Sequence, residues 1–409
     1  MGDFSKYFTM TEADAVEYAA TRLDVFAPGA RLTCKEIGDG NLNFVFRIAD
    51  ENSGRSIIIK QAGPVARISD EFKVSPDRNR IEYEILRVQN ELAPGLVPNV
   101  YHYDPVMNCC VMEDLSDHVI MRKALLEHRQ FPLFADHITT FMANTLLLTS
   151  DVVMNHKDKK VQAGRFINPD LCEITEDLVY TEPFYDCPRN DIFPPTREVA
   201  RRLLWEDDRL LLETAKLKFA FMTNAQSLVH GDLHTGSIFV RPDSTKVIDP
   251  EFAFYGPAGY DVGNVIANLI FAYVNARQTM AEGEDKERHI GWVLQTIGEV
   301  ADLFRDKFAR LFEERATERV ARYPGFAGHY LDGIMRDASA VTGLELCRRT
   351  LGIAHVKDLT SIADPDKRAE AERICLIAGK TLILERDAIL TGKDYLDVVR
   401  DSVAKAASW

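Results

Sequence analysis

The sequence predicts an α+β fold with two lobes, in which a small β-rich lobe precedes a larger helical one. Residues 33–113 contain short runs of β-branched and aromatic residues, which are typical of strands. Beyond about residue 120 the apolar residues recur at helical spacing, and only two short β-like runs interrupt them. We expect the lobes to meet near Glu113–Asp117, so that residues 1–115 form the first lobe and residues 116–409 the second.

The first lobe is expected to be a sheet with one helix. Four runs of strand-forming residues lie at 44–48, 57–59, 100–103 and 109–112. Asn52-Ser53-Gly54 separates the first two runs and is typical of a hairpin turn. Between the second and third runs, apolar residues recur every three or four positions at Ile81, Ile85, Val88 and Leu92. This spacing predicts a helix with one apolar face, which Pro94-Gly95 would end.

The second lobe is expected to be mainly helical. Long amphipathic stretches predict helices at about 121–150, 197–225, 262–277, 287–318, 327–352 and 365–388. The two β-like runs within this lobe are Ile238-Phe239-Val240 and Lys246-Val247-Ile248. Residues 151–196 contain several prolines and aspartates, so we expect a long connection or insertion there.

Composition and charge argue against several classes of protein. The 409 residues carry 49 Lys and Arg against 63 Asp and Glu, which gives a formal net charge of −14. A protein this acidic is not expected to bind nucleic acid or to dock on anionic membrane. We find no apolar run long enough to cross a bilayer and no signal-peptide pattern. The seven cysteines form no C-x-x-C pair, which favours reduced thiols and a cytoplasmic location over zinc or disulfides.

Two features of the first lobe could contact a nucleotide. Gly38 and Gly40 lie between two expected strands, where glycines let backbone N–H groups approach phosphate, although an ordinary hairpin turn is the alternative. Lys60 ends an apolar strand and could pair with phosphates, or it could be a plain strand-end lysine. A buried lysine needs a carboxylate partner, and helical spacing does not choose between Glu82 and Glu84.

A third feature is the segment Glu113-Asp114-Leu115, which follows an apolar strand. Backbone groups in such a segment can hydrogen-bond an adenine edge, while apolar side chains sandwich the ring. A strand that simply ends in polar residues is the alternative interpretation.

Carboxylates dominate the most informative part of the sequence. Asp232, within His230-Gly231-Asp232-Leu233-His234, follows one apolar strand, and Asp249 and Glu251 follow the next one. An aspartate on a loop between buried strands is well placed to accept a proton from a hydroxyl group. Two carboxylates at this spacing suit a Mg²⁺ ion that bridges phosphate oxygens. Each could be a turn former or a helix cap by itself, but together and in this order they predict phosphoryl transfer to a small molecule.

These features, in this order, resemble the protein-kinase-like fold of aminoglycoside phosphotransferases and choline kinases. The longer strings are similar to those of the S-methyl-5-thioribose kinase family. They are Gly38-Asp39-Gly40-Asn41-Leu42-Asn43, Met112-Glu113-Asp114-Leu115-Ser116-Asp117, Phe166-Ile167-Asn168-Pro169, His230-Gly231-Asp232-Leu233-His234-Thr235-Gly236-Ser237 and Asp249-Pro250-Glu251-Phe252. The resemblance extends from about residue 8 to past residue 390. It implies transfer of phosphate from ATP to the anomeric hydroxyl of 5-methylthioribose, a step of methionine salvage.

The resemblance also implies which residues bind ATP. They would be Gly38, Gly40, Asn43, Lys60, Glu82, Glu113, Asp114, Leu115, Asp249 and Glu251. Among them, Glu82 rather than Glu84 would be the partner of Lys60, and the segment 113–116 would form the hinge that holds adenine.

On the catalytic side, the resemblance makes Asp232 the base that also holds the sugar. Asp249 and Glu251 would bind Mg²⁺, and Asp261 would brace the loop of Asp232 through backbone bonds. Protein kinases have a metal-binding asparagine where this chain has Ser237, so Glu251 would supply the missing ligand.

Arg348 and Arg349 resemble an arginine pair that reaches the sugar site from the C-terminal helices. Neighbours on a helix point about 100° apart, so we expect one of the two to face the ligand. Such a cation would repel an aminoglycoside or choline and would favour a neutral thiosugar. Homoserine and the cationic acceptors remain alternatives, as does a non-catalytic pseudokinase, which predicts the loss of Lys60, Asp232 or Asp249. All three residues are present. The family also leads us to expect a homodimer.

Overall fold

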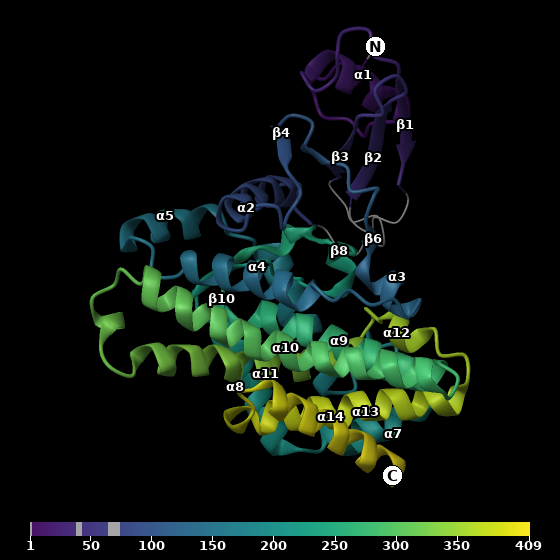
Figure 1. Cartoon of the computed structure of the whole chain (residues 1–409), viewed down its shortest axis with the longest axis vertical. Coiled ribbons are helices and arrows are strands. Elements are labelled where there is room, and N and C mark those ends of the chain that lie inside the picture. Colours follow the sequence, from purple (N-terminus) through teal and green to yellow (C-terminus); the bar gives the residue numbers. More distant parts are fainter. Residues whose placement is uncertain (1, 38–42, 64–73) are drawn as a thin grey trace.

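The computed structural model of the chain describes residues 2–37, 43–63 and 74–409. It confirms the predicted α+β class, because a small antiparallel sheet lies at one end of a much larger helical body (Figure 1). Gly38 and Gly40 lie outside the described residues, so their contact with phosphate stays a prediction.

The sheet has five strands, which pair antiparallel in the order β1-β2-β3-β5-β4. These strands are β1 (Leu32–Glu36), β2 (Asn43–Asp50), β3 (Ser56–Ala62), β4 (Val100–Asp104) and β5 (Cys109–Glu113). Alternation along β3 sends Ile57 and Ile59 to one face, where they pack with residues of α1 (Glu12–Arg22). Lys60 therefore points to the opposite face, which α2 (Arg78–Leu92) covers.

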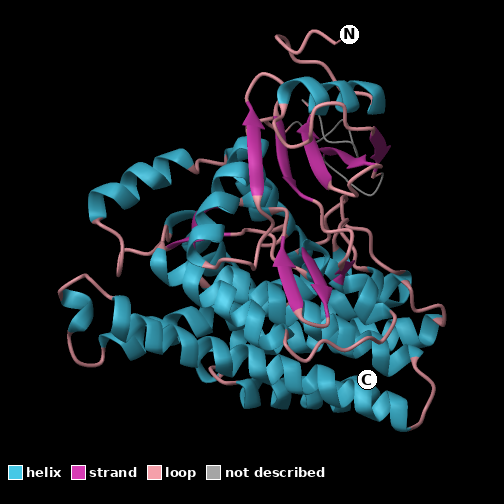
Figure 2. Ribbon diagram, turned by 45° about the horizontal axis from the view of Figure 1, so that its top comes forward, coloured by secondary structure: helices cyan, strands magenta, loops and turns pink. Residues whose placement is uncertain are grey.

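Helices make up most of the remaining chain (Figure 2). The longest are α4 (Phe134–Leu148), α8 (Asp208–Thr223), α9 (Gly259–Thr279), α10 (Glu284–Arg315), α11 (Phe326–Leu351), α13 (Pro365–Leu384) and α14 (Gly392–Ala407). α9 packs against α10, α11 and α13, and it is buried from Gly259 to Ala276. α11 is buried from Ala338 to Leu351, next to α9 and α13. No helix that the structure describes is both long enough and apolar enough to span a membrane.

Two small sheets support the loops that carry the predicted carboxylates. β7 pairs with β10, and β8 lies between β6 and β9. The strands are β6 (Val119–Ile120), β7 (Ser227–Val229), β8 (Ile238–Arg241), β9 (Ser244–Val247) and β10 (Phe254–Gly256). Asp232 lies on the connection from β7 to β8, and Asp249 and Glu251 lie on the connection from β9 to β10. Each of the two connections therefore runs between the same two small sheets.

Two of the predicted long helices are divided in the structure. Residues 121–150 form α3 (Met121–Leu126) and α4, with Pro132 in the connection between them. Residues 197–225 form α7 (Arg197–Ala200), a π-helical turn and then α8. Asp207 starts α8, because its carboxylate accepts a hydrogen bond from the N–H of Leu210 at 3.0 Å.

The segment 151–196, which we expected to be a connection or insertion, contains two helices instead. They are α5 (His156–Arg165) and α6 (Pro169–Leu178). The helix α6 was not predicted because Pro169, which suggested a loop, occupies the first turn of this helix, where proline is favoured. Asn155 likewise caps α5 through its side chain.

Candidate active site

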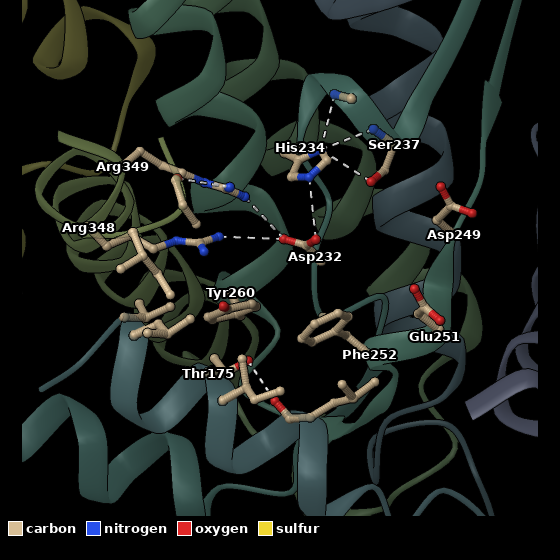
Figure 3. A pocket seen from close by; sticks show the side chains of 18 of the residues that line it. Thr175, Asp232, His234, Ser237, Asp249, Glu251, Phe252, Tyr260, Arg348 and Arg349 are labelled. Atoms are coloured by element: carbon tan, nitrogen blue, oxygen red, sulfur yellow. Dashed lines mark hydrogen bonds and ion pairs between the residues drawn. The ribbon is translucent and has the colours of Figure 1, made fainter. Parts of the chain in front are cut away.

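A cavity of about 770 Å³ lies where the sheet meets the helical body. Its walls contain most of the residues for which the sequence predicted a role in catalysis or in binding, namely Asn43, Lys60, Asp232, Asp249, Glu251, Arg348 and Arg349. Asp232, Asp249 and Glu251 all line the cavity, and Figure 3 shows Asp232 between the arginine pair on one side and Asp249 and Glu251 on the other. Three carboxylates from two separate loops therefore converge on one cavity.

Lys60 joins the sheet to its predicted partner on α2 and also to Asp249. Its Nζ donates to Oε1 of Glu82 on α2 at 2.9 Å and to Oδ1 of Asp249 at 2.5 Å. Glu84 instead pairs with Arg80 and Arg165 on the outer side of α2. The choice that helical spacing left open is therefore settled for Glu82.

The charges around Lys60 determine its protonation. Burial opposes the charge of the ammonium group, but the carboxylates of Asp249 and Glu82 outweigh burial and raise the pKa of Lys60. Burial also opposes the charge of Glu82 and raises its pKa, although the attraction of Lys60 acts in the opposite direction. Lys60 thus stays protonated and faces the cavity as a cation.

The loop that carries Asp232 is held in place by hydrogen bonds to Asp261. Oδ2 of Asp261 accepts a hydrogen bond from the N–H of His230 at 2.7 Å, and its Oδ1 accepts one from the N–H of Gly231 at 3.1 Å. This geometry confirms the predicted bracing role of Asp261, at the N-terminal end of α9. His230 adds a bond from its ring to the carbonyl of Ile248, which ties this loop to the segment before Asp249.

Asp232 faces three basic side chains. Nε2 of His234 lies 3.4 Å from its Oδ2, and Nη2 of Arg348 and Nη2 of Arg349 each lie 3.5 Å from its Oδ1. Burial alone would raise the pKa of Asp232, but His234 and the two arginines hold it well below its usual range. The carboxylate is therefore ionised and able to accept a hydrogen bond or a proton from a ligand.

Both members of the arginine pair line the cavity, although we expected only one to do so. The expectation considered only the direction in which each residue leaves the helix. Arginine side chains are long, and here both bend toward Glu345, one turn earlier on α11. Glu345 accepts a bond from Nε of Arg348 and another, at 2.9 Å, from Nε of Arg349.

Asp249 and Glu251 present two carboxylates to the cavity from the loop after β9. Asp249 has a left-handed backbone, with φ at 59°, which aspartate adopts more readily than most residues. Glu251 is held by its neighbours, because its Oε2 accepts from Asn43 at 2.9 Å and lies 3.5 Å from Nε of Arg78. Asn168 also donates to the carbonyl of Glu251 at 2.8 Å.

These two carboxylates suit a hard divalent cation that takes its other ligands from water and phosphate. Within the described ranges, no group of three or more histidine, cysteine, aspartate or glutamate side chains could hold a metal ion. A metal at Asp249 and Glu251 would therefore depend on ligands that a nucleotide brings.

The predicted hinge segment lies outside the cavity wall. Oε2 of Glu113 accepts from the backbone of Asn99 at 2.9 Å, and Asp114 accepts from Arg47 at 2.6 Å. Their side chains are thus engaged with the protein, as is that of Leu115, which is buried. A contact between this segment and adenine stays a prediction.

Sequence reasoning missed a third arginine of the cavity. Arg122, on α3, donates to Asn268 at 2.6 Å and lies 3.5 Å from Asp358. Nothing in the local sequence around α3 signals this role, because the partners of Arg122 lie on α9 and α12 (Lys357–Thr360).

An apolar wall of the cavity was also missed, because most of it comes from the segment 151–196, where the sequence predicts a long connection or insertion. It consists mainly of α6 residues and two aromatic side chains, namely Leu171, Ile174, Leu178, Val179, Phe252 and Tyr260. Phe252 and Tyr260 lie beside Asp232 in Figure 3. The cavity therefore offers charged groups and an apolar surface around the same carboxylate.

A lysine of a sheet paired with a glutamate of the neighbouring helix, two carboxylates next to it and a separately braced aspartate together define a phosphotransferase with a protein-kinase-like fold. Residues 33–293 match the phosphotransferase enzyme family, and the chain belongs to this family. Among solved structures, choline kinase from Cryptosporidium parvum aligns with 96% of this chain and 94% of its own, with a TM-score of 0.48 and 12% identity.

Similarity to curated proteins narrows the class. The chain is 42% identical to the methylthioribose kinase of Bacillus pumilus over 400 residues, which cover 98% of each chain. It is 44% identical to the methylthioribose kinase of Geobacillus kaustophilus over 392 residues, or 96% of each chain. Within the phosphotransferases, the chain therefore belongs to the methylthioribose kinases, and it is an ATP-dependent kinase.

Proposed function

We propose that this protein transfers the γ-phosphate of ATP to the 1-hydroxyl of 5-methylthioribose and so forms 5-methylthioribose 1-phosphate in methionine salvage. One observation carries the proposal beyond similarity. Asp232, held between an arginine pair and an apolar wall, shares a cavity with Lys60, Asp249 and Glu251.

The nucleotide would occupy the side of the cavity next to the sheet. Lys60 is a buried cation on that side, so it would pair with phosphate oxygens, as would the amide of Asn43. Glu82 would keep Lys60 in place through their ion pair. Gly38, Gly40 and the segment 113–115 complete the proposed site through backbone contacts with phosphate and adenine.

Asp249 and Glu251 would hold Mg²⁺. Both are carboxylates that line the cavity beside Lys60, and carboxylate oxygens are the protein ligands that this ion prefers. The bound ion would neutralise charge on the phosphate oxygens. Asn43 and Arg78 would keep Glu251 in place for this role, through the contacts described above.

The acceptor would lie next to Asp232. The carboxylate of Asp232 would accept the proton of the 1-hydroxyl as the oxygen of that hydroxyl attacks the γ-phosphate. The bond between the γ-phosphate and ADP would break, so that ADP leaves. Arg348 and Arg349 would stabilise negative charge that develops in the transition state, because their guanidinium groups converge on the same point.

The two kinds of surface around Asp232 support a neutral thiosugar over a cationic acceptor. The buried Arg348 and Arg349 and the partly buried Arg122 would repel an aminoglycoside or choline, whereas the sugar hydroxyls can accept hydrogen bonds from them. The apolar wall from α6 would cover the methylthio group, which has no polar atom to satisfy.

A cytoplasmic location and a homodimer complete the proposal. All seven cysteines are free, which supports a reducing compartment. Sedimentation of the purified protein at several concentrations tests the dimer.

The experiment that tests the proposed function compares acceptors by the release of ADP. We expect turnover with 5-methylthioribose, and at most weak turnover with choline, homoserine or an aminoglycoside. Ribose lacking the methylthio group is the matched control for the apolar wall and should show a higher KM. Phosphorus NMR of the product should place the phosphate on C1. Efficient turnover of any cationic acceptor, or a phosphate on another carbon, would contradict the proposal.

A further inference from the structure

We propose that Glu345 is a positioning residue, which aims both members of the arginine pair at Asp232 and offsets one of their two charges. This inference rests on the proposed function in one respect, namely that the arginine pair takes part in phosphoryl transfer. The contacts on which it depends are those of the protein alone.

The first argument is geometric. Glu345 precedes Arg348 and Arg349 by three and four residues, which places all three on one side of α11. Its two carboxylate oxygens are divided between the pair, since Oε2 accepts from Nε of Arg348 and Oε1 from Nε of Arg349. A guanidinium group is planar and rigid, so fixing Nε also fixes the direction of the Nη atoms. The result is that Nη2 of each arginine lies 3.5 Å from the same oxygen, Oδ1 of Asp232.

The second argument is that few other contacts could set this direction. Arg349 has one further anchor, a bond from Nη1 to the carbonyl of Ala354 at 3.2 Å. Within the part of the chain that the structure describes, the side chain of Arg348 has only Glu345 and Asp232 as hydrogen-bond or ion-pair partners. The orientation of the Arg348 side chain toward Asp232 therefore depends on Glu345.

The third argument is electrostatic. Glu345 is only 1% exposed, so water does not screen its charge. Burial opposes ionisation, but the two arginines outweigh it and lower the pKa of Glu345 to about 2. Two cations thus face two anions, Glu345 and Asp232. Without Glu345, an uncompensated positive charge would lie beside the acceptor site, where it would attract anions.

Two substitutions separate the effect of Glu345 on the orientation of the arginines from its effect on the charge of the site. Glu345→Gln keeps the size of the side chain but removes the charge and one of the two acceptor oxygens. Glu345→Asp keeps the charge but is one methylene shorter, so it can no longer reach both Nε atoms. We would measure kcat, the KM for each substrate, the melting temperature and the binding of inorganic phosphate by calorimetry.

We expect kcat to fall at least about tenfold in both variants, with the KM for ATP changed less than about twofold. Only Glu345→Gln should bind inorganic phosphate more tightly, by about tenfold, because only this variant leaves a surplus positive charge. In turnover assays that phosphate should compete with the sugar.

Glu372→Gln is the matched control. Glu372 is a fully buried glutamate of α13 that accepts from Nε of Arg368, four residues earlier, at 2.8 Å. It does not line the cavity. We expect both this variant and the Glu345 variants to melt at a lower temperature than the native protein, but only this variant to keep the native kcat and phosphate affinity.

The inference is overturned if both Glu345 variants keep kcat within twofold of the native value while their melting temperatures fall as in the control. It is also overturned if phosphate binds equally to Glu345→Gln and the native protein. Phosphate binding needs no turnover, so it tests the charge argument even if the native protein fails to phosphorylate 5-methylthioribose. That failure would contradict the proposed function alone. If Glu345→Gln does not fold, the kcat of the charge-conserving Glu345→Asp decides.

Discussion

The ammonium group of Lys60 lies 2.5 Å from the carboxylate of Asp249, so the sheet and the loop after β9 meet directly across the cavity. The same ammonium group also bonds to Glu82, whose side chain is only 1% exposed. One cation therefore balances two carboxylates, of which Glu82 has little access to water and Asp249 is 43% exposed. Loss of Lys60 should therefore lower the stability of the fold mainly through Glu82, because water can solvate the carboxylate of Asp249 but not that of Glu82.

We predict that Lys60→Met lowers the free energy of unfolding by about 3–5 kcal/mol, because it leaves Glu82 buried without its cation. Urea denaturation measures this change. The double variant Lys60→Met/Glu82→Gln removes the unpaired charge and should recover much of the stability without recovering kcat. Equal stability of the single and double variants would contradict the ion-pair explanation.

Asp232→Ala should lower kcat by about 10² or more, as the loss of a general base does. ATP affinity should be unchanged, because the partners of Asp232 are His234 and the arginine pair rather than Lys60. Steady-state kinetics and calorimetry with a non-hydrolysable ATP analogue measure the two effects. Near-normal turnover would remove Asp232 from the role of base.

Glu251→Ala should raise the Mg²⁺ concentration needed for half-maximal activity, because only Asp249 would remain as a carboxylate ligand. A Mg²⁺ titration at saturating ATP measures this change. Glu84→Ala is the control, since Glu84 lies on α2 but pairs with Arg80 and Arg165 away from the cavity. An unchanged titration in the Glu251 variant would mean that Glu251 only supports the fold.

Gly231→Ala should destabilise the protein more than Gly29→Ala. Both glycines have a positive φ, +83° and +78°, which costs a residue with a Cβ atom about 1–2 kcal/mol. A Cβ atom at Gly29 would meet nothing within 4 Å, whereas one at Gly231 would lie 2.4 Å from the carbonyl oxygen of Phe252. Overpacking should therefore add about 1–3 kcal/mol at Gly231 alone. Equal losses in urea denaturation would mean that the two loops do not depend on this close approach.

The sequence predicted those site residues whose type and order carry the chemistry. Lys60 could be found because it directly follows the apolar run of isoleucines in β3, although β3 continues beyond it, and Asp232 and Asp249 because each follows an apolar strand. Local patterns were enough for these three, since alternation along β3 fixes the face that Lys60 occupies and the two aspartates come shortly after the strands β7 and β9. The partner of Lys60 was harder to predict. Glu82 and Glu84 lie on different sides of α2, and the sequence does not show which of these sides faces the sheet.

The remaining site residues depend on tertiary packing. The apolar wall needs α6 to lie against Phe252, and no local pattern predicts that contact. Glu345 was missed for a different reason. Its spacing from Arg348 and Arg349 was visible in the sequence, but the same spacing on an exposed helix would have been an ordinary surface ion pair. Because that half of α11 is buried, the same spacing produces a buried ion-pair cluster beside the cavity.

Acid should destabilise the native protein more steeply than it destabilises Glu345→Gln. The folded-state pKa of Glu345 is about 2, below the ordinary value of 4.5. A carboxylate with a lowered pKa stabilises the fold above its ordinary pKa, and this stability is lost as the pH falls from about 4.5 toward 2. The loss amounts to about 3 kcal/mol, because each pKa unit corresponds to about 1.4 kcal/mol.

Urea denaturation between about pH 6 and pH 3 tests this prediction, because its midpoint reports stability at each pH. Glu372→Gln provides a control of opposite sign. Burial raises the pKa of Glu372, so that residue stabilises the fold at low pH and this stability is lost as the pH rises. Its replacement should make the protein slightly more sensitive to acid, whereas Glu345→Gln should make it less so. Parallel curves for the native protein and Glu345→Gln would mean that the arginine pair does not hold Glu345 in its charged form.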